Sequence, residues 1–513
     1  MAILSRDELI LARNESRPLA RPLPVTDDSL SRRAASGIFW TAMERWGSRL
    51  LSLLVFAVLG RLLTPDDFGL VAIVTAIMAV VGVFVEYGFA QSLVQRETLR
   101  EIDVWTSFWT SVAFGAILYL LLWLATPLVV MVFAEPQLAE IIPVSGTVLL
   151  ISGLASVPAA TLQRELKFRP LAARQLAGSV LGAAVALVMA FLGAGIWALV
   201  LQPVVAAAAG AFVLWVAARW RPVFQYSFAS LRASWGFSAQ VIAIELLNSL
   251  QSNADKLIVG FFFTPAQLGY YFLGQRVLTI LMEIVASVMS KVSLPALSRV
   301  QKDHQRFLQY FYTFTFASAA IAFPAFAVVT VFGYPITEFL FGPGWGQAVP
   351  LMALLAPSAA LASVTFFDKS ALLAKGRGDV SLGVAAGQFA FGTAVLFAAV
   401  PFGVTAVAAG RSARQFMFWP VRIIALKKHS GVRPSDYLRR FLAPSVGVLG
   451  LAAVGLGLQL TPWAMAPLPM LSFVVPASLL SLTVYALILW LMAGNQIRQI
   501  LAIVRRGRGG AKN

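Results

Sequence analysis

Thirteen ionisable side chains lie inside long apolar segments of this sequence. A charge at mid-bilayer depth costs about 2.5–3.5 kcal/mol on insertion scales, so such a residue usually faces a partner or a water-filled cavity. Arginine suits phosphate binding because its guanidinium stays charged and offers a planar fork of donors. The candidate substrate-binding arginines are Arg45, Arg49, Arg276, Arg411 and Arg414. The carboxylates that could couple an ion to substrate movement are Glu86, Glu245, Asp255 and Glu283.

The spacing of the polar residues assigns them to helix faces. In the first and the seventh apolar segments, polar side chains recur every three or four positions, as expected of helices that line a cavity. Arg276 and Glu283 are seven residues apart and share a face, which makes Arg276 the first choice for a substrate ligand. Arg411 and Arg414 are one helical turn apart.

Local explanations stay open for some of these charges. Arg45 and Arg49 lie near one end of their segment and could extend to the lipid headgroups. Asp255 and Lys256 lie near the opposite membrane face and could form a local ion pair. Arg276 has neither explanation, and for it a cavity is favoured.

The composition predicts a helical membrane protein. Apolar residues make up 59% of the 513 positions and charged residues 12%, about half the share of a soluble domain. A run of about 18 apolar residues can span a bilayer, and this sequence consists mostly of such runs. We therefore expect an all-α, polytopic membrane protein with about 14 transmembrane helices. The absence of cysteine excludes disulfides and thiolate metal sites, and both histidines fall in predicted loops.

The connecting segments predict the orientation. Six alternate loops hold 21 Lys and Arg, whereas the other seven hold a single basic residue, Arg61. By the positive-inside rule, the basic loops and both termini are cytoplasmic. The net charge of +17 therefore indicates contact with anionic lipid and no nucleic-acid partner. The predicted spans lie near 37–60, 70–94, 104–133, 141–162, 172–192, 196–217, 235–260, 268–290, 308–337, 347–373, 380–400, 404–425, 441–460 and 469–493.

Two short segments indicate an internal duplication. The matched residues are Thr64, Pro65 and Gly69 in the first segment and Thr264, Pro265 and Gly269 in the second. Thr-Pro should end one helix, because proline lacks an N–H and pushes the preceding residue out of the α region. The polar pair that follows should start the next helix, and the glycine should allow close packing. Repeats that enter the membrane in the same direction are related by an axis along its normal.

The duplication predicts two six-helix repeats, spans 1–6 and 7–12, followed by two C-terminal helices. The predicted organisation is a disordered cytoplasmic tail over 1–36, an N-lobe over 37–217, a cytoplasmic linker over 218–234, a C-lobe over 235–425, helices 13 and 14 over 426–493, and a basic cytoplasmic tail over 494–513.

Several catalytic and nucleotide-binding motifs are absent from the sequence. It contains no G-x-x-x-x-G-K-[ST] phosphate loop, no H-E-x-x-H zinc motif and no G-x-S-x-G serine motif. We therefore expect no cofactor, no metal and no enzymatic activity. An ion gradient is the expected energy source.

Four segments carry a resemblance to a known family: Ser36-Gly37-Ile38-Phe39-Trp40, the turn over 60–69, Asp255-Lys256-Leu257-Ile258-Val259-Gly260 and Leu268-Gly269-Tyr270-Tyr271. In these segments the chain resembles the Wzx-type polysaccharide flippases of the multidrug, oligosaccharidyl-lipid and polysaccharide exporter superfamily. The resemblance covers about residues 30 to 495. It implies fourteen helices in two lobes and a cationic cavity for a diphosphate-linked lipid oligosaccharide. It also implies alternating access that moves the headgroup between leaflets. It assigns no substrate-binding residue.

The expected function is to flip undecaprenyl-diphosphate-linked oligosaccharide units to the outer leaflet of the bacterial inner membrane. Expected partners are this lipid-linked oligosaccharide, membrane lipids, and the polysaccharide polymerase and glycosyltransferases of the pathway. Three alternatives stay open. A multidrug or cation antiporter would need an apolar or acidic cavity, whereas the interior charges here are seven basic and six acidic. A peptidoglycan-precursor flippase would differ only in the sugar. A polysaccharide polymerase or ligase would need a large outer loop, and every predicted outer loop is short.

Overall fold

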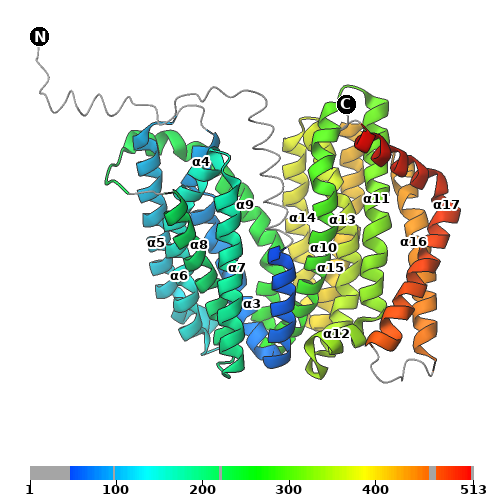
Figure 1. Ribbon diagram of the computed structural model, residues 1–513, viewed down its shortest axis with the longest axis horizontal. Helices are drawn as coiled ribbons and strands as arrows, with labels where there is room; N and C mark the ends of the chain where they lie inside the picture. Colours follow the sequence, from blue (N-terminus) through cyan, green and yellow to red (C-terminus); the bar gives the residue numbers. More distant parts are fainter. Residues whose placement is uncertain (1–46, 96–98, 219–221, 462–469, 510–513) are drawn as a thin grey trace, which may run out of the picture. The chain divides into compact units, whose positions relative to one another are not determined.

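The computed structural model describes residues 47–95, 99–218, 222–461 and 470–509, and the elements within these ranges are helices. Most of them are long (Figure 1). By its internal contacts the chain divides into two compact units, with the boundary between Phe261 and Phe262. The all-α, polytopic class predicted from composition is confirmed.

Unit 1 contains the helix over residues 47–62 and seven labelled helices. Helix α6 packs against α5, α3, α4 and α8, and α7 packs against α8. The labelled helices are α3 (Pro65–Glu86), α4 (Phe89–Gln95), α5 (Glu101–Phe133), α6 (Leu138–Arg164), α7 (Phe168–Phe191), α8 (Trp197–Ala218) and α9 (Phe228–Phe262). The predicted second span is thus interrupted, because α3 ends at Glu86 and α4 begins at Phe89.

In unit 2, α13 is the central helix, and it packs against α10, α11 and α15. Helix α16 packs against α11 and α17, and α14 packs against α15. The α-helices of this unit are α10 (Pro265–Arg299), α11 (His304–Val331), α12 (Gly333–Phe341), α13 (Ala348–Ala374), α14 (Gly378–Ala399), α15 (Val404–Ser430), α16 (Pro434–Gln459) and α17 (Val475–Gly509). The short elements are two 3-10 turns, Pro343–Trp345 and Val400–Phe402, and a π-helical segment, Met470–Val474.

Within the described residues each predicted span overlaps one or two helices, and ten helices there are long and apolar enough to cross a membrane. The helix over 47–62 and helices α9, α10 and α15 are not among those ten. The first of these helices has only 16 described residues, and α9, α10 and α15 carry most of the intramembrane charges identified in the sequence. The total of fourteen spans therefore stays a prediction.

The unit boundary does not coincide with the predicted linker between lobes. The prediction began the C-lobe at residue 235, whereas α9 begins at Phe228 and its contacts place it in unit 1. The predicted lobes rest on the sequence duplication, and their limits remain a prediction.

The two Thr-Pro turns start helices in the same way, as predicted. Thr64 is the N-cap of α3, and its side chain accepts a hydrogen bond from the Asp67 N–H (3.3 Å) while the Asp67 carboxylate accepts one from the Thr64 N–H (3.0 Å). Thr264 and Gln267 form the corresponding reciprocal pair at the start of α10 (3.4 and 3.3 Å). Each pair satisfies two backbone donors that a helix start otherwise leaves without partners.

We predict that Thr264→Ala lowers the free energy of unfolding by about 1 kcal/mol, because the N-cap acceptor is lost. The measurement is thermal unfolding of the purified protein in detergent. Thr483→Ala is the control, because Thr483 is exposed in α17 and donates only to the carbonyl of Leu480 in its own helix. Equal stability of the two variants would refute the capping argument.

Candidate functional site

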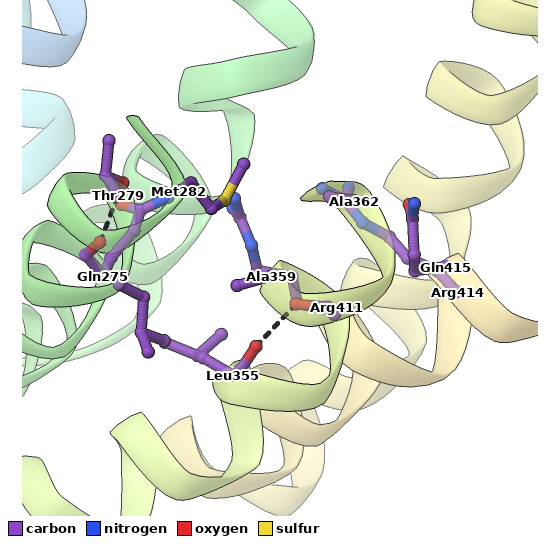
Figure 2. A pocket seen from close by; sticks show the side chains of 11 residues that line it. Gln275, Thr279, Met282, Leu355, Ala359, Ala362, Arg411, Arg414 and Gln415 are labelled. Atoms are coloured by element: carbon purple, nitrogen blue, oxygen red, sulfur yellow. Dashed lines mark hydrogen bonds between the residues drawn. The ribbon is translucent and has the colours of Figure 1, made fainter. Parts of the chain in front are cut away.

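A pocket of about 90 Å³ lies inside unit 2, between α10, α13 and α15 (Figure 2). Its polar lining comes from α10, α13 and α15, and its apolar lining from α10 and α13. The described lining residues include two arginines and no carboxylate. They are Gln275, Leu278, Thr279, Met282, Leu355, Ser358, Ala359, Ala362, Arg411, Arg414 and Gln415.

The cationic side of the pocket is one face of α15. Arg414 and Gln415 follow Arg411 by three and four positions. A helix therefore turns all three side chains to the same side. In Figure 2 both arginine side chains extend from α15 into the pocket. Arg414 is 9% exposed and Arg411 is half-buried. Two guanidinium groups without an acidic neighbour in the lining make the pocket suitable for an anion.

Neighbouring helices fix the position of α15. The Ser412 hydroxyl donates a hydrogen bond to the carbonyl of Leu354 in α13. On α14, Gly392 lies directly against the Arg414 side chain, and a Cβ at this position would be 2.9 Å from the Arg414 Cδ. The missing side chain of Gly392 therefore provides the space in which Arg414 lies. The buried Tyr271 of α10 is within electrostatic range of Arg414.

Amide groups complete the polar lining. Gln415 accepts a hydrogen bond from the Gln388 side chain of α14 (2.7 Å), which holds its amide across the α14–α15 contact. Gln275 is buried on α10, and its backbone carbonyl accepts a hydrogen bond from Thr279 one turn later (2.8 Å). Amides beside guanidinium groups can bind sugar hydroxyls next to a charged group.

The structure brings together two of the five predicted arginines. Arg411 and Arg414 line the pocket, whereas Arg276, the first choice from the sequence, is half-buried on α10 and is not among the lining residues. Arg49 is half-buried in the helix over 47–62 of unit 1. Arg45 lies outside the described residues.

The predicted ion-coupling carboxylates occupy separate places. In unit 1, Glu86 is the exposed last residue of α3 and lies within electrostatic range of Arg174 on α7. Glu245 accepts a hydrogen bond from the Asn248 side chain (3.4 Å) one turn later in α9. Asp255 is fully buried in α9. In unit 2, Glu283 is half-buried on α10 and does not line the pocket.

A further buried carboxylate, Asp368 of α13, belongs to an aromatic cluster. The Tyr437 hydroxyl of α16 approaches both Asp368 oxygens (3.0 and 3.2 Å) and accepts a hydrogen bond from the Trp419 indole of α15 (3.4 Å). Phe311 of α11 stacks on Tyr437 with ring centroids 5.8 Å apart. This cluster connects four helices of unit 2, which supports a structural role for Asp368.

The sequence analysis did not identify Gln275, Gln415 or Gly392. Gln415 could have been found, because it follows Arg414 and lies one turn beyond Arg411. Gly392 could not, because its role depends on which residue of α14 meets Arg414. Arg174 was not among the intramembrane charges selected from the sequence, yet it lies inside α7. Within the described ranges, no group of three or more His, Cys, Asp or Glu side chains could hold a metal ion.

Comparison with known proteins identifies the family. A family model described as polysaccharide biosynthesis protein matches residues 58–350, more than half of the chain. The chain belongs to this family. The predicted resemblance to Wzx-type polysaccharide flippases is thereby confirmed.

Curated relatives of the chain include two bacterial proteins. The teichuronic acid biosynthesis protein TuaB of Bacillus subtilis (strain 168) is 25% identical over 377 residues, which are 73% of this chain and 78% of TuaB. The lipopolysaccharide biosynthesis protein WzxC of Escherichia coli (strain K12) is 25% identical over 355 residues, which are 69% of this chain and 72% of WzxC.

Solved structures support the fold. The lipid II flippase MurJ in an inward closed conformation matches with a TM-score of 0.72 at 11% identity, over 90% of this chain and all of that chain. An inward-facing multidrug transporter of the MATE family matches with a TM-score of 0.61 at 13% identity, over 75% of this chain and 94% of that chain. The likeness to MurJ and to the MATE protein establishes a shared polytopic helical fold.

Gly392→Ala should weaken anion binding in this family member without changing its charge. The new methyl group would displace the flexible end of Arg414, and loss of one charge-assisted hydrogen bond, about 1.5–3 kcal/mol, corresponds to roughly tenfold or more weaker binding. The measurement is equilibrium dialysis of the purified protein with inorganic diphosphate.

Gly383→Ala on the same helix is the matched control, because a Cβ there would meet nothing within 4 Å. Unchanged diphosphate binding by Gly392→Ala would show that Arg414 is not held in place by this contact.

Proposed function

We propose that the protein flips an undecaprenyl-diphosphate-linked oligosaccharide from the cytoplasmic to the outer leaflet of the bacterial inner membrane. The observation that carries this proposal is the pairing of Arg411 and Arg414 in one pocket of unit 2. A diphosphate diester carries two negative charges, which two guanidinium groups would balance. Planar guanidinium forks bind phosphate oxygens in pairs and cannot be neutralised by proton loss.

Neighbouring groups in the pocket support a sugar as well as a phosphate. Gln275, Gln415 and Ser358 lie beside the arginines and offer amide and hydroxyl groups. The pocket volume of about 90 Å³ is small, so it would hold the diphosphate and its nearest sugar atoms. The isoprenoid tail would remain in the bilayer, so the protein would not need to bind it.

A transport cycle follows if the headgroup lies in the pocket while the lipid tail lies in the bilayer. Alternating access moves a binding site between the two faces of a membrane without opening a continuous pore. In this cycle the arginines hold the headgroup while its tail stays in lipid, and release follows when the site opens to the outer face. The names of the relatives, a teichuronic acid biosynthesis protein and a lipopolysaccharide biosynthesis protein, support a cargo of this class.

Ion coupling is assigned to the intramembrane carboxylates. The candidates remain Glu86, Glu245 and Asp255 in unit 1 and Glu283 in unit 2. Among them Glu86 has a cationic neighbour, Arg174, within electrostatic range. Protonation of Glu86 would end this attraction and leave Arg174 available to other groups.

The experiment is glycan export in a strain that lacks the native gene, together with membrane abundance of each variant. We expect Arg414→Gln to abolish export at normal abundance, and Arg414→Lys to retain part of it, because lysine keeps the charge but loses the bidentate geometry. Arg411→Gln and Arg411→Lys should follow the same order.

Lys428→Gln provides the matched control, because Lys428 is exposed on the same helix and lies away from the pocket. It should leave export unchanged. Full export by Arg411→Gln and by Arg414→Gln would remove both residues from substrate binding and overturn the proposal.

A further inference from the structure

The first turns of α9 and the segment before it expose large apolar side chains, whereas three serines of α9 are buried. Ser230, Ser234 and Ser238 recur every four residues and are all buried. On the outward side, Phe228 is 78% exposed and Trp235 is 52% exposed. This arrangement is the reverse of an amphipathic helix in water, where the apolar face packs inward.

Hydrogen bonds to α5 hold this segment in place. The Ser230 hydroxyl donates to the Asp103 carboxylate (2.5 Å), and the Ser227 N–H donates to the Thr106 hydroxyl (3.0 Å). The Trp109 indole donates to a backbone carbonyl of the preceding segment, that of Val223 (2.9 Å). Figure 1 shows this end of α9 at the end of unit 1 where α5 begins. The outward aromatic face is therefore presented in a fixed orientation.

The outward face forms an open groove whose lining includes one arginine side chain. Phe228, Leu231, Arg232 and Trp235 line a hollow of about 390 Å³. Phe224, just before the helix, is 82% exposed. A groove with aromatic walls and a guanidinium matches the interfacial zone of a bilayer, where aromatic rings lie at headgroup level and arginine meets phosphate.

The length of α9 allows this groove to lie at the membrane surface. A helix of 35 residues is about 52 Å long at about 1.5 Å per residue, whereas the hydrocarbon core is about 30 Å thick. Some 15 residues of α9 therefore lie outside the core. The positive-inside prediction places the N-terminal end of α9 on the cytoplasmic side.

We infer that residues 223–235 form a docking surface for the cytoplasmic leaflet, with an anionic lipid headgroup at Arg232 and acyl-chain carbons against Phe228 and Trp235. Residues 222–234, part of the segment expected from the sequence to be a cytoplasmic linker, are then anchored in the lipid interface. Burial of the exposed rings in that interface accounts for their outward orientation, because apolar area is removed from water there.

The absence of cysteine from the chain allows a local test on the full-length protein. A fluorophore on Ala233→Cys, an exposed position beside the groove, reports lipid contact through quenching by brominated lipid. The protein is reconstituted into vesicles of phosphatidylcholine and phosphatidylglycerol, with bromine on one lipid or the other. Leu124→Cys, 61% exposed on α5, is the control for lipid contact, and the exposed Lys428→Cys is the control for water.

We expect the label at position 233 to be quenched as at position 124, and more strongly by brominated phosphatidylglycerol. An arginine near an anionic surface strengthens attraction about fivefold, so Arg232→Gln should lower the preference for phosphatidylglycerol by about that factor. Absence of quenching, as at position 428, would overturn the proposal. Shielding of the label in native membranes but not in vesicles would assign the surface to a protein partner and also overturn it. Quenching with no lipid preference, unaffected by Arg232→Gln, would refute the headgroup at Arg232.

Discussion

A guanidinium keeps its charge at any physiological pH and cannot be left bare in hydrocarbon, and this constraint governs the interior of unit 2. Arg411 and Arg414 have no carboxylate beside them in the described lining of their pocket. The bundle instead surrounds them with amide and hydroxyl groups, and Gly392 of α14 makes room for Arg414. A cationic pocket built in this way can accept an anion, and the proposed diphosphate headgroup would supply it.

The two units share their construction and differ in their charges. Both begin a long helix at a Thr-Pro turn with reciprocal capping hydrogen bonds, Thr64 with Asp67 and Thr264 with Gln267. In unit 1 the arginine of α7, Arg174, has an acidic neighbour in Glu86. The predicted duplication would explain the shared helix starts, and Arg411 and Arg414 give the pocket of unit 2 its positive lining.

Features that depend on local chemistry could be predicted from the sequence. The helix starts at Pro65 and Pro265 follow from proline geometry and capping, and the all-α membrane class follows from long apolar runs. The shared face of Arg411 and Arg414 follows from helical periodicity. Features that depend on packing between helices could not be predicted. Arg276 has a favourable spacing to Glu283, but the rotation of α10 directs Gln275 to the pocket instead.

The start of α9 shows a second limit of sequence reasoning. The sequence assigned residues 218–234 to a cytoplasmic linker, yet Ser230 turns inward to Asp103 of α5 and Phe228 is exposed. Composition alone does not predict whether a side chain points into the bundle or away from it. The direction comes from tertiary contacts such as that between Ser230 and Asp103.

Binding of a lipid-linked diphosphate to the purified protein tests the central claim most directly. Native mass spectrometry in detergent would compare the wild-type chain with the Arg411→Gln/Arg414→Gln double variant, using undecaprenyl diphosphate with and without a sugar. Loss of two charge-assisted contacts, each worth about 1.5–3 kcal/mol, predicts at least ~100-fold weaker binding by the double variant for both ligands. Equal binding of undecaprenyl diphosphate by the two proteins would contradict the account, because the headgroup would then be held elsewhere.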